Sequence, residues 1–304
     1  MNQTREDVQT ENSELIQAFS EHMAKTEFSI STRKGYCRDL ETLNQFLTEK
    51  VQTLEPGAKG NSIPFTKLSA GIILEHRGWL GDAEYAPSTV HRNFAAIKAM
   101  CAYLQAIGKI GTDPTMGITY PNKPRKAAPG VVSSEEIERL FAQTAGNAFR
   151  HRDRVILRLV ILCGVKISEL EGLRRSDLTE NTDEMRLELR LKNPSGRSRL
   201  VPLPEEVAKD MESYLASQLD SRPEAPLFIN KHGNKISCRS LRRRISGHIK
   251  KAGLSLSLTT MELRYHYIRQ LVAKRKTRRE IRTLVGSVND VMLGELEAEL
   301  RSSQ

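Results

Sequence analysis

The sequence lacks the features that would place it in a membrane, a secretion pathway or a metal site. No run of 18 or more apolar residues occurs in its 304 residues, and its N-terminal stretch MNQTREDVQTENSELI is polar. The four cysteines, at positions 37, 101, 163 and 238, lie far apart, with no CxxC pair and no histidine at ligand spacing. We therefore expect a cytoplasmic protein with buried thiols, without zinc or another metal and without a cofactor.

Aromatic residues are scarce throughout the chain, and acidic residues are scarce in one long basic stretch. Only 5% of residues are aromatic, and they do not alternate with basic residues as in proteins that stack unpaired bases. The stretch from Arg239 to Arg282 contains fourteen Lys or Arg but only two carboxylates, whereas a solvated helix face normally mixes both signs. The net charge of +10 is therefore concentrated, which favours a polyanionic partner over a merely basic surface. Double-stranded DNA, bound through its phosphates, fits better than a membrane.

The chain length suggests two domains, and the pattern changes between them. Stretches between residues 12 and 110 repeat apolar residues three or four positions apart, which predicts a helical bundle over 1–120. The stretch TYPNKPRKAAPGVV has prolines and basic side chains but no periodicity, so we place a linker at 121–131. Within 132–304, MRLELRLKNPSGRSRLVPL alternates apolar and polar residues around a turn, which predicts a β-hairpin at 185–203.

The stretch VILCGVKISELEGL, residues 160–173, places Lys166 directly after a glycine turn and between residues typical of a core. A lysine in a turn is normally solvated, so this stretch alone does not predict a site. Its position within a longer pattern changes that interpretation.

The order of elements resembles the tyrosine recombinases, also called phage integrases, of the Xer-like type. The resemblance covers about residues 12 to 296 and rests on ISELEGLRRSDL, a basic hairpin ending in RLVPLP, and PLFINKHGNKIS. The interval from LR at 263–264 to GS at 286–287 matches the family's interval without a gap. STRKGYCRDL and PSTVHRNFAAIKAMCAYL resemble two N-terminal helices that the family lays against DNA.

This resemblance implies a mainly α fold with a small β-sheet, divided between two domains. The N-terminal one, 1–120, would be a SAM-like helical core-binding domain. The C-terminal one, 132–304, would be a mixed α/β domain of the catalytic type with a tail helix.

The resemblance also maps the family's phosphoryl-transfer positions onto this chain. The first catalytic arginine falls on Lys166, the hairpin lysine on Lys192 and the second arginine on Arg264. The two histidines fall on Met261 and Ser287. Lysine remains cationic but cannot make a two-pronged contact to phosphate, and methionine cannot transfer a proton.

The family's tyrosine nucleophile has no counterpart at its usual place. Counting from Ser287 by the family's interval reaches Leu296, and no tyrosine follows Tyr267. Tyr265 and Tyr267, beside Arg264, remain open as displaced nucleophiles. Loss of one acid or base costs about a factor of 10² to 10⁴, but loss of the nucleophile ends the reaction.

We therefore expect a catalytically inactive member, not an enzyme, that keeps sequence-specific binding of double-stranded DNA. A repressor or control protein of a phage or other mobile element is the first interpretation. An architectural partner of an active recombinase is the second, and an active site-specific recombinase with an unconventional nucleophile is the third.

The two domains are expected to close on DNA as a C-shaped clamp. Consecutive arginines at 242–244 point in different directions around a helix, so two are expected to reach DNA and one to pack or pair. The expected DNA-binding residues are Arg33, Lys34, Arg38, Ser88, Thr89, His91, Arg92, Lys98, Lys166, Lys192, Arg197, Arg239, Arg242, Arg243 and Arg264.

The C-terminal stretch VNDVMLGELEAELRSSQ is acidic and short. Val291, Leu293, Leu296 and Leu300 fall close to one face of a helix. Because such a helix is marginal alone, we expect it to dock on a second copy and support self-association on DNA. Packing on its own domain is the alternative.

Overall fold

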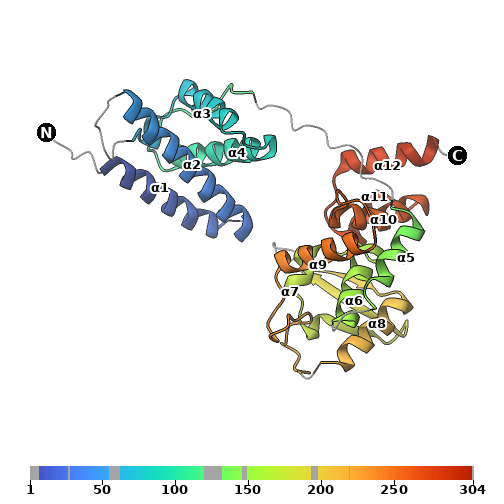
Figure 1. Ribbon diagram of the computed structural model, residues 1–304. Coiled ribbons are helices and arrows are strands. Elements are labelled where there is room, and N and C mark those ends of the chain that lie inside the picture. The colour runs from blue at the N-terminus through green and yellow to red at the C-terminus, as the bar shows by residue number, and fades with distance from the viewer. Residues whose placement is uncertain are drawn as a thin grey trace. The chain divides into compact units, whose positions relative to one another are not determined.

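The computed structural model describes residues 7–26, 28–54, 62–119, 132–145, 149–192, 198–218 and 220–302. The chain divides into two compact units, residues 1–125 and 126–304, and each is described by itself (Figure 1). The linker expected at 121–131 lies outside the described residues. The functional names given to the two domains, and their bounds, stay predictions.

The described residues of the N-terminal unit form a bundle of four helices, shown from blue to green in Figure 1. They are α1 (Asp7–Ala24), α2 (Ile30–Leu54), α3 (Ala70–Asp82) and α4 (Pro87–Ala106), with a short 3-10 helix at Phe65–Lys67. Local sequence sets the helix starts, because Ser69 caps α3 by accepting from the Ile72 amide and Pro87 occupies the first turn of α4. Phe19, Leu43 and Ile97 lie in the core between the helices.

The C-terminal unit combines helices with one small sheet. Its elements are α5 (Ser134–Ala142), α6 (Arg150–Leu162), α7 (Ile167–Gly172), a 3-10 helix (Arg175–Asp177), β1 (Leu178–Asn181), β2 (Arg186–Lys192), β3 (Ser198–Pro202), α8 (Glu205–Ala216), α9 (Cys238–Lys251), α10 (Thr260–Ala273), α11 (Arg278–Val285) and α12 (Asp290–Ser302). The strands pair antiparallel in the order β1-β2-β3, with Leu189 opposite Val201. The β-hairpin and the mainly α fold with a small sheet are therefore confirmed.

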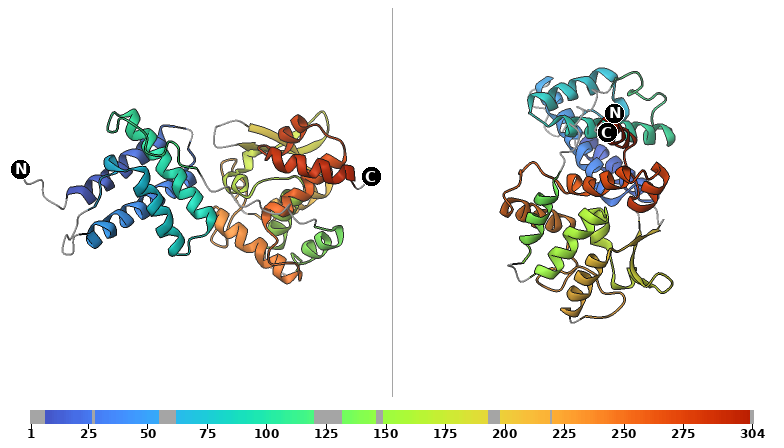
Figure 2. Two further views of the ribbon diagram at one scale, coloured as in Figure 1. Left: turned by 90° about the horizontal axis from the view of Figure 1, so that it is seen from above. Right: turned by 90° about the vertical axis from the view of Figure 1, so that its right-hand side faces the viewer.

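The hydrophobic core of this unit lies between the sheet and the helices. Leu189, Leu191 and Val201 are buried on one face of the sheet, where they join Val155 and Leu159 of α6 in one cluster. Helices α10, α11 and α12, red in Figures 1 and 2, gather at one end of the unit around a second cluster. The turns between α6 and α7 and after α11 lie at that end.

The prediction that the apolar face of the C-terminal helix docks on a second copy is wrong. Helix α12 packs on its own domain, with Met292, Leu293 and Leu296 buried against α10 and α11. Ion pairs Arg278–Glu297 at 2.6 Å and Arg269–Glu299 at 2.8 Å reinforce this contact. The acidic tail thus finds basic partners within its own basic domain, which satisfies both its charge and its apolar face. Self-association through the tail stays a prediction.

In the described ranges, the structure has neither a membrane-spanning helix nor a metal-binding group. No helix there is long and apolar enough to cross a membrane, and no three His, Cys, Asp or Glu side chains form a metal-binding group. All four cysteines are free thiols; Cys101 and Cys163 are buried, while Cys37 and Cys238 are half-buried. Burial raises the pKa of Cys101 and Cys163 to about 12. The cytoplasmic location and the lack of a cofactor stay predictions.

Candidate functional site

The turn between α6 and α7 presents Lys166. Gly164 has φ +64°, and a Cβ there would lie 2.7 Å from Cδ1 of Tyr267, so both the conformation and the close approach require glycine. Lys166 follows as the residue before α7, and its amide donates to Oε2 of Glu169 at 2.8 Å. The lysine is therefore held at the start of a helix and half-buried rather than freely solvated.

The structure brings Lys166 to Ser287, 121 residues along the chain. Nζ of Lys166 donates to Oγ of Ser287 at 2.7 Å. Ser287 is exposed and follows Gly286, whose φ of +74° ends α11. Burial lowers the pKa of Lys166; Glu169 opposes that shift, and Arg264 and Arg199 add to it. The positions of the family's first arginine and second histidine thus form one hydrogen-bonded pair.

Arg264 ties the two turns of this site together. Its side chain is 3% exposed, Nε donates to the Gly164 carbonyl at 2.6 Å, and Nη2 donates to the Val285 carbonyl at 2.6 Å. Burial lowers the pKa of the guanidinium, and the nearby Glu169 opposes that shift. One buried cation therefore fixes the turn before Lys166 against the turn before Ser287.

Arg199 completes the site, although it was not among the residues expected from the sequence. Its guanidinium makes a two-pronged ion pair with Glu169, at 2.6 and 2.9 Å, and Nε donates to the Leu284 carbonyl at 2.9 Å. The alternation of β3 could have indicated it, because Arg199 shares the inward face with Val201, where a cation needs a partner.

These residues form a site with excess positive charge. We call it the cationic pocket, and its members are Lys166, Glu169, Arg199, Arg264 and Ser287. Three cations against one carboxylate favour binding of an anion such as a phosphodiester.

The other positions implied by the resemblance lie elsewhere. Lys192, at the end of β2, is 63% exposed and pairs with Asp177 at 3.3 Å, so its ammonium is held by a different element. Met261, in the first turn of α10, is 49% exposed. Leu296 is 3% exposed within the tail's core cluster, so it serves packing. Arg197 lies outside the described residues.

One of the three consecutive arginines of α9 is paired, as expected, while contact of the other two with DNA stays a prediction. Arg239, Arg242 and Arg243 are exposed, whereas Arg244 donates to the buried Asp153, with Nε 2.9 Å from Oδ1. Although burial raises the pKa of Asp153, the hydrogen bonds from His248 and Arg244 outweigh it and lower that pKa below its usual range. Arg244 is therefore the one that pairs, and the salt bridge fastens α9 to α6.

The N-terminal candidates lie on α2 and α4. Lys34, Arg38, Ser88 and Lys98 are exposed, while Arg33, Thr89 and His91 are half-buried. Arg92 differs from the rest, because Nε and Nη2 donate to the two oxygens of buried Asp39 at 2.7 and 2.9 Å. That hydrogen bond raises the pKa of Arg92. Arg92 thus joins α4 to α2, although its side chain is still 46% exposed.

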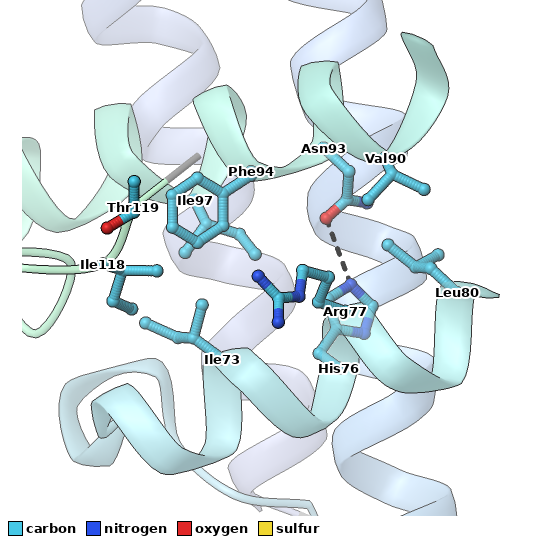
Figure 3. A pocket seen from close by; sticks show the side chains of 10 residues that line it. All are labelled: Ile73, His76, Arg77, Leu80, Val90, Asn93, Phe94, Ile97, Ile118 and Thr119. Carbon is cyan, nitrogen blue, oxygen red and sulfur yellow. Dashed lines mark hydrogen bonds between the residues drawn. The ribbon is translucent and has the colours of Figure 1, made fainter. Parts of the chain in front are cut away.

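A small apolar cavity lies between α3 and α4 in the N-terminal unit (Figure 3). Ile73, Leu80 and Phe94 are among its lining residues, and Nε2 of His76 lies 3.1 Å from Oδ1 of Asn93 (Figure 3). Burial lowers the pKa of His76 to about 4, opposed by that hydrogen bond. The histidine is therefore neutral near pH 7 and joins two helices, a role that the sequence did not reveal.

Comparisons with known proteins agree on one family. A family model described as the phage integrase family matches residues 131–294. The tyrosine recombinase XerD of Pseudomonas putida is 27% identical over 266 residues, covering 85% of this chain and 83% of that protein. The tyrosine recombinase XerC of Chlamydia caviae is 27% identical over 248 residues, covering 77% of each.

Two solved structures have a similar fold. The XerH site-specific recombinase bound to palindromic difH substrate, a post-cleavage complex, has a TM-score of 0.69 at 17% identity, covering 89% of this chain and 78% of that one. The Tn1549 transposon integrase in complex with transposon right end DNA has a TM-score of 0.67 at 16% identity, covering 95% and 98%. These similarities confirm the tyrosine-recombinase fold.

The prediction that the protein is not an enzyme is wrong, because the relatives that it matches over most of its length are tyrosine recombinases, which are enzymes. The prediction depended on the replaced family positions at Lys166, Met261 and Ser287, on the lack of a tyrosine after Tyr267, and on the count to Leu296. That count excludes a tyrosine there but does not exclude another nucleophile. The comparisons also give no support to a repressor.

Proposed function

Because the chain belongs to the phage integrase family, we propose that it binds a specific site on double-stranded DNA and acts there in site-specific recombination. The cationic pocket is the observation that carries this proposal. Its three basic side chains outnumber its one carboxylate, and Lys166 and Ser287 offer an amine and a hydroxyl at one place, with Nζ and Oγ 2.7 Å apart. Such donors suit the nonbridging oxygens of a phosphodiester, on which negative charge builds up during phosphoryl transfer.

The surfaces outside the pocket supply the remaining affinity in this proposal. The exposed arginines of α9 would contact phosphates on the same duplex, and Lys34, Arg38 and Lys98 would supply contacts from the N-terminal unit. The clamp of two domains stays part of the proposal. The complex of the Tn1549 integrase with transposon right end DNA, and that of the XerH recombinase with palindromic difH substrate, support DNA as the ligand.

Two narrower roles expected from the sequence remain hypotheses about the same DNA binding. Occupation of promoter DNA would make the protein a regulator, and binding beside a second recombinase would make it an architectural partner. The substitution of a lysine for the two-pronged arginine favours them, because a point charge grips a phosphate with less geometric constraint. A genome-wide footprint separates the roles, since it shows whether the sites overlap promoters or recombination junctions.

The experiment that tests the proposal is selection of bound duplexes from random DNA, followed by affinity measurements on the selected site. We expect one preferred sequence, with Lys166→Ala weakening binding to it. Lys209→Ala is the matched control, because Lys209 is an exposed lysine on α8 that pairs with Glu205. Equal affinity for the selected site and for unrelated duplexes would overturn the proposal.

A further inference from the structure

Strand transfer requires a nucleophilic hydroxyl, and the usual position does not supply one. No tyrosine follows Tyr267, and Leu296 is buried in the core of its own domain. We infer that Ser287 attacks the DNA phosphate, with Lys166 as its general base, so that the protein forms a phosphoserine bond to DNA. This inference rests on the proposed function.

The distance between the two groups is that of a nucleophile and its base. Oγ of Ser287 lies 2.7 Å from Nζ of Lys166, within the reach that proton transfer requires. Ser287 is exposed, so a duplex can approach it, whereas Lys166 is half-buried. This combination leaves the attacking oxygen open and partly shields the base from water.

The base is also oriented by further groups, as in other nucleophile–base pairs. Glu169 accepts from the Lys166 amide at 2.8 Å and is itself held by the two-pronged pair with Arg199. Arg264 bonds to the carbonyls of Gly164 and Val285, which lie on the two turns that carry Lys166 and Ser287. The pair is therefore positioned by contacts from three elements.

The surroundings of Lys166, chiefly its burial, shift its pKa in the direction that a general base requires. Burial lowers the pKa of Lys166, and the positive charges of Arg264 and Arg199 lower it further, while Glu169 opposes them. In the proposed step, the guanidinium groups of Arg264 and Arg199 provide the positive charge that stabilises the phosphate in the transition state. Deprotonation of the lysine does not remove the anion-binding character of the pocket.

The step balances without a cofactor. Oγ of Ser287 forms a bond to phosphorus, its proton passes to the neutral Nζ of Lys166, and one bond between phosphorus and a deoxyribose oxygen breaks. The leaving oxygen takes a proton from water. The phosphate remains a diester, now joined to serine, so attack by a DNA hydroxyl can reverse the step and rejoin a strand.

The two tyrosines near Arg264 are poorer candidates. Tyr265 and Tyr267 pack against the core cluster of α10–α12, and Tyr267 lies against Gly164. Burial raises the pKa of both phenols, which makes the phenolate harder to form. Among the described residues, neither phenol oxygen shares a hydrogen bond with a possible base, so the geometry favours Ser287.

The test uses the full chain and a nicked suicide duplex that carries the selected site. We expect a protein–DNA band that survives denaturation and is lost on alkaline treatment, because a phosphoserine ester eliminates in base and a phosphotyrosine ester does not. Mass spectrometry should place the nucleotide on Ser287. At DNA concentrations that saturate the site, Ser287→Ala should abolish the band, whereas Ser213→Ala, which changes an exposed serine on α8, should keep it.

Lys166→Arg separates a base from a mere phosphate ligand. Arginine keeps the positive charge but does not deprotonate in proteins, so the covalent band should form about 100-fold more slowly or not at all, with DNA binding retained. An equal or faster rate would overturn the inference. So would an alkali-stable band on Tyr265 or Tyr267, or site binding with no covalent band. Absence of site-specific binding would instead overturn the proposed function, and the inference with it.

Discussion

The arginines of α9 make a sharp prediction about the salt dependence of DNA binding. Arg242 and Arg243 are exposed, whereas the neighbouring Arg244 is committed to Asp153. We expect that replacing Arg242 and Arg243 with alanine removes two phosphate contacts, while Arg244→Ala removes none. The three substitutions are matched, because they delete the same side chain from consecutive positions of one helix.

The size of the effect follows from counterion release. Each phosphate contact contributes about 0.9 to the slope of log affinity against log salt concentration. The double variant should therefore have a slope shallower by about 1.8. Between 50 and 200 mM salt, both proteins lose affinity. The fold-loss of the wild type should be about 12 times the fold-loss of the double variant. Fluorescence anisotropy of a labelled site across this range measures both slopes.

Arg244→Ala should act on stability instead. Its removal leaves the carboxylate of Asp153 buried with Arg152 and His248 as remaining partners. Loss of one partner of a buried ion pair destabilises by several kcal/mol, and about 2 kcal/mol is expected because Arg244 is partly exposed. Thermal unfolding measures this cost. The reasoning is refuted if Arg244→Ala flattens the salt slope as much as the double variant does, or if the double variant keeps the wild-type slope.

Three further predictions concern stability. The pKa of His76 is about 4 in the folded protein and 6.5 in the unfolded chain, so the unfolded chain takes up the proton first as pH falls. The free energy of unfolding should therefore fall as pH drops from 6.5 towards 4, and at pH 5 it should be about 2 kcal/mol lower than at neutral pH. Urea unfolding followed by fluorescence of Trp79, the single tryptophan, checks this, and His76→Gln should remove that component. Gly164→Ala should destabilise by about 2 kcal/mol, measured by thermal unfolding, because of its positive φ and the contact with Tyr267. Deleting residues 290–304 should lower the free energy of unfolding by about 5 kcal/mol, because three buried side chains of α12 are lost. A truncated protein that keeps wild-type stability but no longer binds paired sites cooperatively would instead favour docking of the tail on a second copy.

The sequence alone determined what depends on neighbours along the chain. Apolar residues three or four positions apart indicated the N-terminal helices, and alternation indicated the hairpin of β2 and β3. The unmatched positive charge from 239 to 282 is likewise a property of composition. The resemblance to the family, which rests on local motifs and their intervals, placed two of the family's site positions on Lys166 and Ser287.

Only the tertiary structure decided which charges have partners. The sequence cannot show that Arg244 meets Asp153, 91 residues away, or that Arg92 meets Asp39. Equally, the alternation of β3 places Arg199 on the inward face, but only the packing of β3, α7 and α11 brings it to Glu169 and the cationic pocket. An ion pair depends on the distance between two side chains, and between elements far apart in sequence that distance is set by packing of the core. For the same reason the acidic tail, marginal as an isolated helix, finds its partner surface within its own domain.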